Sequence, residues 1–214
     1  MTRTRALVEA ALAGNPPALL AAGRLAEYLD LLLRASEEMN LVSRREAETG
    51  ALVSRHLLDA LEALPLLPPA SGRTLRILDV GSGGGFPAIP LLLVRPDLEG
   101  VLVEATGKKA RFLDGAIRAL GLTARVVNAR FPDPALELMR NAPPCDLLTS
   151  RAVAGAGEIA RQARPALAPE AVALLWTSEP LLREIRRSLP GAGVAFRLSP
   201  GAERRGLARV ERFT

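Results

Sequence analysis

The chain has 214 residues, of which 49% are hydrophobic, with 28 basic against 23 acidic side chains. This length predicts one medium-sized domain with at most a small appendage, and no apolar run approaches the ~20 residues needed to span a bilayer. One cysteine and one histidine exclude an internal disulfide and a zinc cluster of the usual ligands. We therefore expect no metal and a reducing, cytoplasmic location.

Residues 1–70 predict a helical N-terminal extension that packs on the rest of the chain. The N-terminal Ala/Leu stretch is interrupted by Glu9, so an amphipathic helix is expected there rather than a signal peptide. A second helix begins at a pair of prolines, and Ser43 with Glu46 matches the capping box of a third. The leucines expected to share one face of the second helix are Leu20, Leu25, Leu29, Leu32 and Leu33.

From residue 71 to residue 214, short apolar runs alternate with helical patterns. This alternation predicts a doubly wound α/β sheet. The two last strands have no helix between them, so we expect them to pair antiparallel. The expected strands are 75–81, 99–105, 124–129, 145–152, 171–177, 193–199 and 207–213, and the expected helices are 86–96, 107–122, 134–142, 157–167 and 179–189.

The stretch "ILDVGSGGGFPAIP", residues 77–90, enters a glycine cluster from the first of these strands. Open α/β sheets bind ligands at the carboxyl ends of their strands. Gly81 and Gly83 fit a dinucleotide fingerprint, but Phe86 stands where its third glycine belongs. Pro87 also lacks the amide that a pyrophosphate would need at the helix start. A ligand with a cationic or neutral tail therefore fits this loop better.

Two carboxylates favour S-adenosylmethionine (SAM) as that ligand. Asp79 stands two residues before the first glycine, where an acid tolerates an ammonium or sulfonium group. Glu104 stands at the end of the second strand, 19 residues after Gly85, where a carboxylate can accept both ribose hydroxyls. A nicotinamide cofactor is the alternative. The residues predicted from this pattern to hold SAM are Asp79, Gly81, Gly83, Gly85 and Glu104.

The remaining motifs exclude several methyl-transfer chemistries. The run "NAPPCD" precedes the fourth strand, whereas the Pro-Pro turn of adenine amino-group methylation follows it. The Pro-Cys pair of C5-cytosine enzymes also follows that strand, and Cys145 is expected to be buried at its start. Without a clear base or nucleophile, the simplest reaction is attack by an atom with a free lone pair, such as guanine N7. Alignment of the two reactants can then supply most of the catalysis.

Five segments resemble a known family in order and approximate spacing. They are "MNLVSRRE", "RHLLDAL", "LDVGSGGGFPAIPLLLVRPDL", "VEATGKKARFL" and "SRAVA". They resemble the bacterial small-subunit rRNA guanine-N7 methyltransferases, once named glucose-inhibited division protein B, over residues 36–176. The resemblance implies a Rossmann-like class I methyltransferase fold, SAM as the methyl donor, and a guanine of 16S rRNA in the small ribosomal subunit as the target.

The same resemblance assigns roles to individual residues. Gly81 and Phe86 would line the methionine side of the cofactor, and Glu104 would take the ribose. Phe131 and Pro132 would contact the adenine.

Arg151 would face the active site as the catalytic residue and would also touch the cofactor; alternatively it only bonds a strand-end carbonyl. Asn40, His56 and Asp59 match positions beside the pocket, and Asn40 and His56 are predicted substrate contacts. The alternative for His56 and Asp59 is a structural pair three residues apart on a helix.

The last 34 residues carry 8 basic and 3 acidic side chains, which is the whole positive surplus of the chain. A basic end is an electrostatic footprint for nucleic acid, and Arg204 and Arg205 are its predicted substrate contacts. Alternatively, the basic excess only reflects a compositional bias towards arginine, because 26 of the 28 basic residues are arginine.

The rim of the site departs from the family pattern at Thr177-Ser178, where the family has Lys-Gly, and at Phe131-Pro132, where it has a glutamate nearby. A methyltransferase of another RNA site or of a small molecule, or a non-catalytic RNA-binding relative, therefore stays open. A monomer that binds no membrane is expected.

Overall fold

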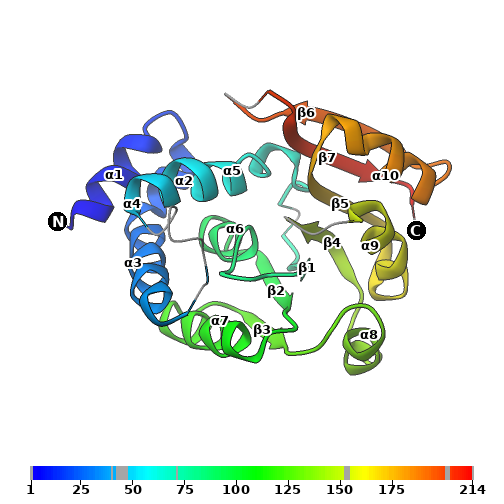
Figure 1. Ribbon diagram of the computed structural model, residues 1–214, viewed down its shortest axis with the longest axis horizontal. Coiled ribbons are helices and arrows are strands. Elements are labelled where there is room, and N and C mark those ends of the chain that lie inside the picture. Colours follow the sequence, from blue (N-terminus) through cyan, green and yellow to red (C-terminus); the bar gives the residue numbers. More distant parts are fainter. Residues whose placement is uncertain are drawn as a thin grey trace.

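The computed structural model describes residues 2–39, 41, 48–70, 72–151, 155–200 and 203–213. Its centre is a seven-stranded sheet in the order β3-β2-β1-β4-β5-β7-β6 (Figure 1). The strands are β1 (Leu75–Val80), β2 (Leu98–Val103), β3 (Ala124–Val127), β4 (Cys145–Ser150), β5 (Leu167–Ser178), β6 (Gly193–Leu198) and β7 (Arg205–Glu211). This arrangement confirms the predicted α/β sheet.

Strands β1 to β5 run parallel, and β7 lies antiparallel between β5 and β6. The predicted antiparallel pairing of the two last strands is therefore confirmed. The reversal brings the start of β7 to the carboxyl end of β5, where Arg205 pairs with Ser178. The helices of this part are α6 (Ala88–Val94), α7 (Gly107–Ala119), α8 (Asp133–Met139), α9 (Ala156–Ala163) and α10 (Leu182–Ser188), with short 3₁₀ turns at Arg164–Ala166 and Glu179–Leu181.

The N-terminal extension is helical, as predicted. Its segments are α1 (Arg3–Ala11), α2 (Pro16–Leu20), α3 (Ala22–Glu38), α4 (Thr49–Leu52), the π-helical turn η1 (Val53–Leu57), α5 (Leu58–Leu61) and a 3₁₀ turn at Leu64–Leu66. The sequence correctly placed Leu25, Leu29 and Leu32 in the core, but Leu20 is 93% exposed. The helix breaks at Ala21, between α2 and α3, so Leu20 does not continue the leucine face of α3. The proposed Ser43–Glu46 capping box and Asn40 lie outside the described residues.

Two of the observed helices differ from the predicted ranges close to a proline. Helix α6 begins at Ala88 rather than at residue 86, so Pro90 occupies its third position. Its missing N–H is harmless there, because the first four amides of a helix have no intrahelical partner. Helix α9 ends at Ala163, two residues before Pro165, and β5 already begins at Leu167. A proline cannot continue the helical hydrogen-bond pattern.

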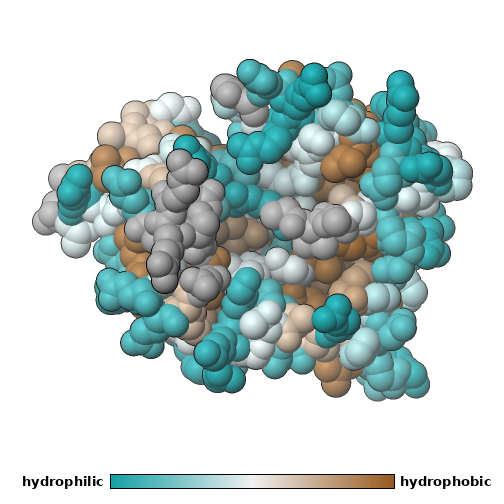
Figure 2. Space-filling model, viewed as in Figure 1, coloured by the Kyte–Doolittle hydropathy of each residue, from teal (hydrophilic) through white to brown (hydrophobic). Residues whose placement is uncertain are grey.

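The extension and the sheet share one hydrophobic cluster. Buried residues of α3 such as Leu25 belong to the same cluster as Ile77 of β1, Leu92 of α6 and Trp176 of β5. A second cluster fills the other face of the sheet, beneath α8, α9 and α10. Hydrophilic side chains dominate the surface seen in Figure 2, and hydrophobic ones show mainly in recesses between them. The extension is therefore packed on the core, whereas a domain boundary at residue 70 stays a prediction.

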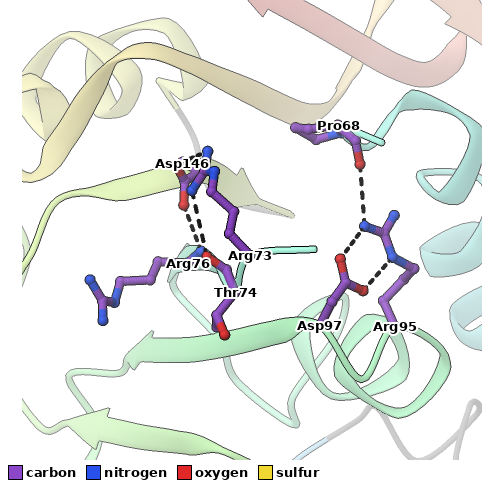
Figure 3. A network of polar contacts seen from close by, with 7 residues as sticks. All are labelled: Pro68, Arg73, Thr74, Arg76, Arg95, Asp97 and Asp146. Carbon is purple, nitrogen blue, oxygen red and sulfur yellow. Dashed lines mark hydrogen bonds and ion pairs between the residues drawn. The ribbon is translucent and has the colours of Figure 1, made fainter. Parts of the chain in front are cut away.

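Polar contacts fix the chain at Pro68, before β1, and at the start of β1 (Figure 3). Arg95 binds Asp97 through two hydrogen bonds of 2.7 and 2.6 Å and donates to the Pro68 carbonyl at 3.2 Å. Asp146 accepts from the Arg73 side chain at 2.9 Å and from the Arg76 backbone amide at 2.8 Å. The chain thus enters β1 along a defined path. Within the described ranges, no helix is long and apolar enough to cross a membrane.

Candidate active site

The glycine loop crosses from the end of β1 to α6 and is tied to β2 by backbone hydrogen bonds. The amides of Gly81 and Ser82 both donate to the Val103 carbonyl, at 3.0 and 3.1 Å. The Gly85 amide donates to the Ser82 carbonyl at 2.7 Å. The loop therefore has a defined shape at the carboxyl edge of the sheet, where open α/β folds bind their ligands.

Glu104 is buried directly after β2 and binds the loop. Its Oε2 accepts from the Gly83 amide at 2.9 Å, and its Oε1 accepts from the Thr106 amide at 2.7 Å. An ionised carboxylate offers about four acceptor positions, so both oxygens keep lone pairs for hydroxyl donors. The structure thus brings together the loop and the acid that the sequence predicted for the ribose. Binding of the ribose itself stays a prediction.

Asp79 is a buried acid at the end of β1 with an unusual environment. Thr149 Oγ1 donates to its Oδ1 at 2.6 Å, while its buried Oδ2 has no hydrogen-bond partner among the described residues. Burial raises the pKa of Asp79 to about 6, and nearby Glu104 adds to the rise against the opposing effects of Ser82, Thr149 and Arg151. A buried polar atom without a partner requires an explanation. A cationic ligand group beside Oδ2 would supply one, and this fits the ammonium and sulfonium of SAM.

Gly83 and Gly85 differ in the space that surrounds them. Gly83 has a φ of +56°, and the nearest atom to an added Cβ would be the Gly81 oxygen, 3.8 Å away. A Cβ at Gly85 would instead lie 2.6 Å from Ile89 Cδ1 and 3.0 Å from the Tyr28 hydroxyl. Gly83 therefore has room beside it for a ligand, whereas Gly85 is required by internal packing. A cofactor contact by Gly85 stays a prediction.

Arg151 follows β4 and points into the extension. Its Nε lies 3.0 Å from Asp59 Oδ2, and its Nη2 donates to His56 Nδ1 at 2.9 Å and to the Arg55 carbonyl at 3.1 Å. The side chain is only 14% exposed. His56 lies in the π-helical turn η1 and Asp59 in α5. The carbonyl that Arg151 binds belongs to this helical turn and not to a strand end, as the sequence alternative had it, and two side chains share the contact.

Phe86 connects the glycine loop to this arginine. Its ring centroid lies 5.3 Å from that of Tyr28, edge to face, and 5.3 Å from that of His56. The Arg151 guanidinium carbon lies 5.6 Å from the same centroid, within cation–π range. Phe86 is nearly buried by these neighbours, and a contact with the cofactor stays a prediction.

Sequence reasoning missed Tyr28. Its hydroxyl is buried and donates to the Gly84 carbonyl at 2.7 Å, so α3 holds the glycine loop directly. The signal was present, because Tyr28 falls on the buried leucine face of α3, and a tyrosine in a core normally finds a hydrogen-bond partner for its hydroxyl. Asn128, after β3, was missed as well; its Nδ2 donates to the Glu104 carbonyl at 2.8 Å.

The other predicted site residues lie at or near this edge of the sheet. Phe131 is half-buried after β3 and packs against the second hydrophobic cluster, with Pro132 as the cap of α8. Arg204 and Arg205 are exposed at the start of β7. Burial raises the pKa of Asp59, and the charges of Arg151 and, less strongly, Arg205 oppose the rise.

The sequence matches the model of the family described as rRNA small subunit methyltransferase G over residues 22–189. The chain belongs to this family. Family members from three bacteria illustrate the match. The relative from Acidiphilium cryptum is 36% identical over 189 residues, which cover 88% of this chain and 76% of the relative. That from Mycolicibacterium gilvum is 36% identical over 182 residues, covering 84% and 75%, and that from Laribacter hongkongensis is 40% identical over 144 residues, covering 67% and 64%.

Solved structures share the fold, among them that of a methyltransferase. Precorrin-6y C5,15-methyltransferase from Geobacter metallireducens superimposes with a TM-score of 0.56 at 16% identity, covering 82% of this chain and 92% of that one. TrmN from Thermus thermophilus gives a TM-score of 0.55 at 20% identity, covering 84% and 52%. The predicted class I methyltransferase fold is thus confirmed, and membership of the small subunit methyltransferase G family confirms the predicted enzyme class and SAM as its cofactor.

Proposed function

We propose that this enzyme transfers the methyl group of SAM to N7 of a guanine in the 16S rRNA of the small ribosomal subunit. The observation that carries the proposal is the largely enclosed Arg151 guanidinium beside Phe86 of the glycine loop. An arginine donor is the commonest partner of a guanine edge. The relatives from Acidiphilium cryptum and Mycolicibacterium gilvum are named ribosomal RNA small subunit methyltransferase G.

The residues at the carboxyl edge suit the cofactor. Bound SAM would supply an electrophilic methyl group on a positively charged sulfur. Glu104 would accept from the ribose hydroxyls with the lone pairs that its two amide contacts leave. Asp79 would face the positive charge of the ligand with Oδ2, and Gly83 would let the backbone approach it closely.

The reaction needs no general base. The N7 lone pair forms the bond to the methyl carbon while the carbon–sulfur bond breaks towards sulfur, and no proton leaves the base. Positive charge moves from the sulfonium to the purine. Arg151 would donate to guanine O6 and leave the N7 lone pair free for the attack. Catalysis then rests on alignment, which can supply ~7–11 kcal/mol.

Exposed arginines at the rim would bind the RNA backbone. Arg204 and Arg205 lie at the start of β7, beside the end of β5. Phosphate contacts of this kind supply affinity and register without reading sequence.

We further propose that the enzyme acts as a monomer in the cytoplasm and without a metal. The methyl transfer described above requires no metal, and the single cysteine suits a reducing compartment.

The test uses purified small ribosomal subunits from a bacterium whose own enzyme of this family has been deleted. After incubation with the protein and SAM, nuclease digestion and mass spectrometry should detect new 7-methylguanosine in 16S rRNA. Subunits incubated without the protein are the control. SAM binding without any methylated rRNA would contradict the proposal and favour a small-molecule substrate or a non-catalytic relative. Methylation of another nucleotide in place of guanine N7 would show that the enzyme acts on a different RNA site.

A further inference from the structure

We propose that Asp59 and His56 are positioning residues for Arg151, so that the helical extension sets the orientation and the charge of the catalytic guanidinium. This inference rests on the proposed function. It assigns His56 a different role from the substrate contact that the sequence predicts.

One short segment of the extension supplies three hydrogen-bond acceptors of the guanidinium. The Arg55 carbonyl, His56 Nδ1 and Asp59 Oδ2 lie at 3.1, 2.9 and 3.0 Å from Arg151 nitrogens. The segment runs from the π-helical turn into α5, and π-helical turns are frequent at functional sites. Residues three apart on a helix are neighbours on its surface. His56 and Asp59 can therefore both bind the planar guanidinium of Arg151.

The contact with Arg151 determines the protonation of the His56 ring. Arginine is a donor only, so Nδ1 of His56 accepts and carries no proton. The proton of the neutral ring is then on Nε2, and His56 adds no charge beside the arginine. Its Nδ1 is engaged by the protein itself, which favours positioning over substrate recognition.

Asp59 has a second task in this reaction. Methylation at N7 leaves a positive charge on the purine, and an uncompensated guanidinium beside that purine would oppose it. The Asp59 carboxylate, 3.0 Å from Arg151 Nε, offsets the positive charge. The Phe86 ring, 5.6 Å from the guanidinium carbon, restricts the group from the side of its face. Arg151 can thus donate to the base with little net positive charge at the site.

The decisive experiment is a double-mutant cycle on methylation of small ribosomal subunits by the full chain. We expect Asp59→Ala and His56→Leu each to lower kcat on the order of tenfold, because a displacement of about 1 Å in a reacting geometry can cost about 100-fold. SAM affinity, measured by calorimetry, should change by less than about twofold. In an Arg151→Lys background, which lacks the Nε–H, the same substitutions should have almost no further effect, since residues that act through one partner are not additive.

Conservative and control variants separate positioning from general damage. Asp59→Asn keeps an acceptor for Nε–H and should recover part of the loss. Glu9→Ala removes a comparable acid from the extension, paired with Arg5 at 2.7 Å on α1, and should leave kcat unchanged. Additive losses in the double variants, or a His56→Leu loss that persists without Arg151, would overturn the proposal and return His56 to substrate binding.

A spectroscopic readout tests the contact without any methyl transfer. In ¹⁵N-labelled protein without SAM, the Arg151 Nε–H resonance should be protected from exchange with water, and Asp59→Ala should remove that protection. An unprotected resonance in the wild type would contradict the positioning role. A wild type that shows the protected resonance but methylates no subunits would instead contradict the proposed function alone.

Discussion

At the scale of single residues, Asp79 is a buried acid whose ionisation lowers the stability of the folded protein. The acid is buried, one of its oxygens has no partner among the described residues, and its pKa is raised to about 6. The folded state therefore holds the Asp79 proton more tightly than the unfolded state, whose pKa is about 4. The contribution of this group to stability is largest below the unfolded pKa, and falls as the pH rises from about 4 to about 6.

Asp79→Asn should stabilise the protein without cofactor at pH 8, because it removes a buried charge and keeps an acceptor for Thr149. Two pKa units correspond to about 3 kcal/mol at most. The gain should shrink to about half of that at pH 5. Urea unfolding at the two pH values measures it, and calorimetry should show weaker SAM binding in the same variant. A loss of stability at pH 8 would show that the Asp79 charge is compensated in solution.

Gly83→Val should abolish SAM binding while the fold survives. The side chain would enter the space beside the loop, where the nearest atom to a Cβ is 3.8 Å away. The positive φ adds a strain of about 1–2 kcal/mol. Gly121→Val is the matched control, because Gly121 has nearly the same φ, +57°, at the end of α7, with no described atom within 4 Å of an added Cβ. Calorimetry and circular dichroism decide: unchanged SAM affinity in Gly83→Val would exclude this loop as the cofactor site.

At the scale of elements, α3 supports the glycine loop from the extension. The Tyr28 hydroxyl binds the Gly84 carbonyl, and its ring packs against Phe86. The loop geometry therefore depends on a helix that lies outside the sheet domain in sequence.

Tyr28→Phe should leave the Gly84 carbonyl buried without its partner and cost about 1–3 kcal/mol of stability. SAM affinity should fall in parallel, because the loop loses a restraint. Thermal unfolding and calorimetry measure both effects, with Leu29→Met, an apolar change on the same helix, as the control for packing. Lower stability with unchanged SAM affinity would show that Tyr28 supports the fold and not the loop.

The sequence predicted elements better than it predicted contacts between them. The alternation of strands and helices, and the placing of Asp79, the glycine loop and Glu104 at one edge, follow from local patterns that the structure bears out. The error at Leu20 concerns where a helix breaks, which depends on packing as well as on propensity. The helix end before Pro165 could have been predicted from the proline itself. The contact of His56 with Arg151 joins residues 95 positions apart, and local periodicity carries no information about such a pair.

At the scale of the whole molecule, charge is unevenly placed. The last 34 residues hold 8 basic and 3 acidic side chains, and two of the arginines lie at the rim of the site. If the excess serves RNA binding, these arginines should affect the salt dependence of RNA affinity. If it only reflects an arginine-rich composition, they should not.

Arg204→Glu with Arg205→Glu should weaken binding to a small-subunit rRNA fragment and flatten its salt dependence by about one unit of slope per lost phosphate contact. SAM affinity should not change. Binding curves at low and moderate salt measure both quantities. Arg186→Glu with Arg187→Glu, in the last turn of α10, is a charge-matched comparison. Equal affinities and slopes for wild type and the Arg204/Arg205 variant would remove the charge argument for an RNA substrate.

The contacts between the extension and the site restrict how members of this family can diverge. Tyr28 of α3 binds the glycine loop, and Asp59 of α5 binds Arg151. The extension therefore cannot be exchanged between relatives as an independent unit. Chimeras that combine one member's extension with another's sheet should fold wherever their apolar surfaces match, and should lose activity where the two parents differ at the positions of Tyr28, His56, Asp59 or Arg151. Across the family, positions 56, 59 and 151 should therefore change together.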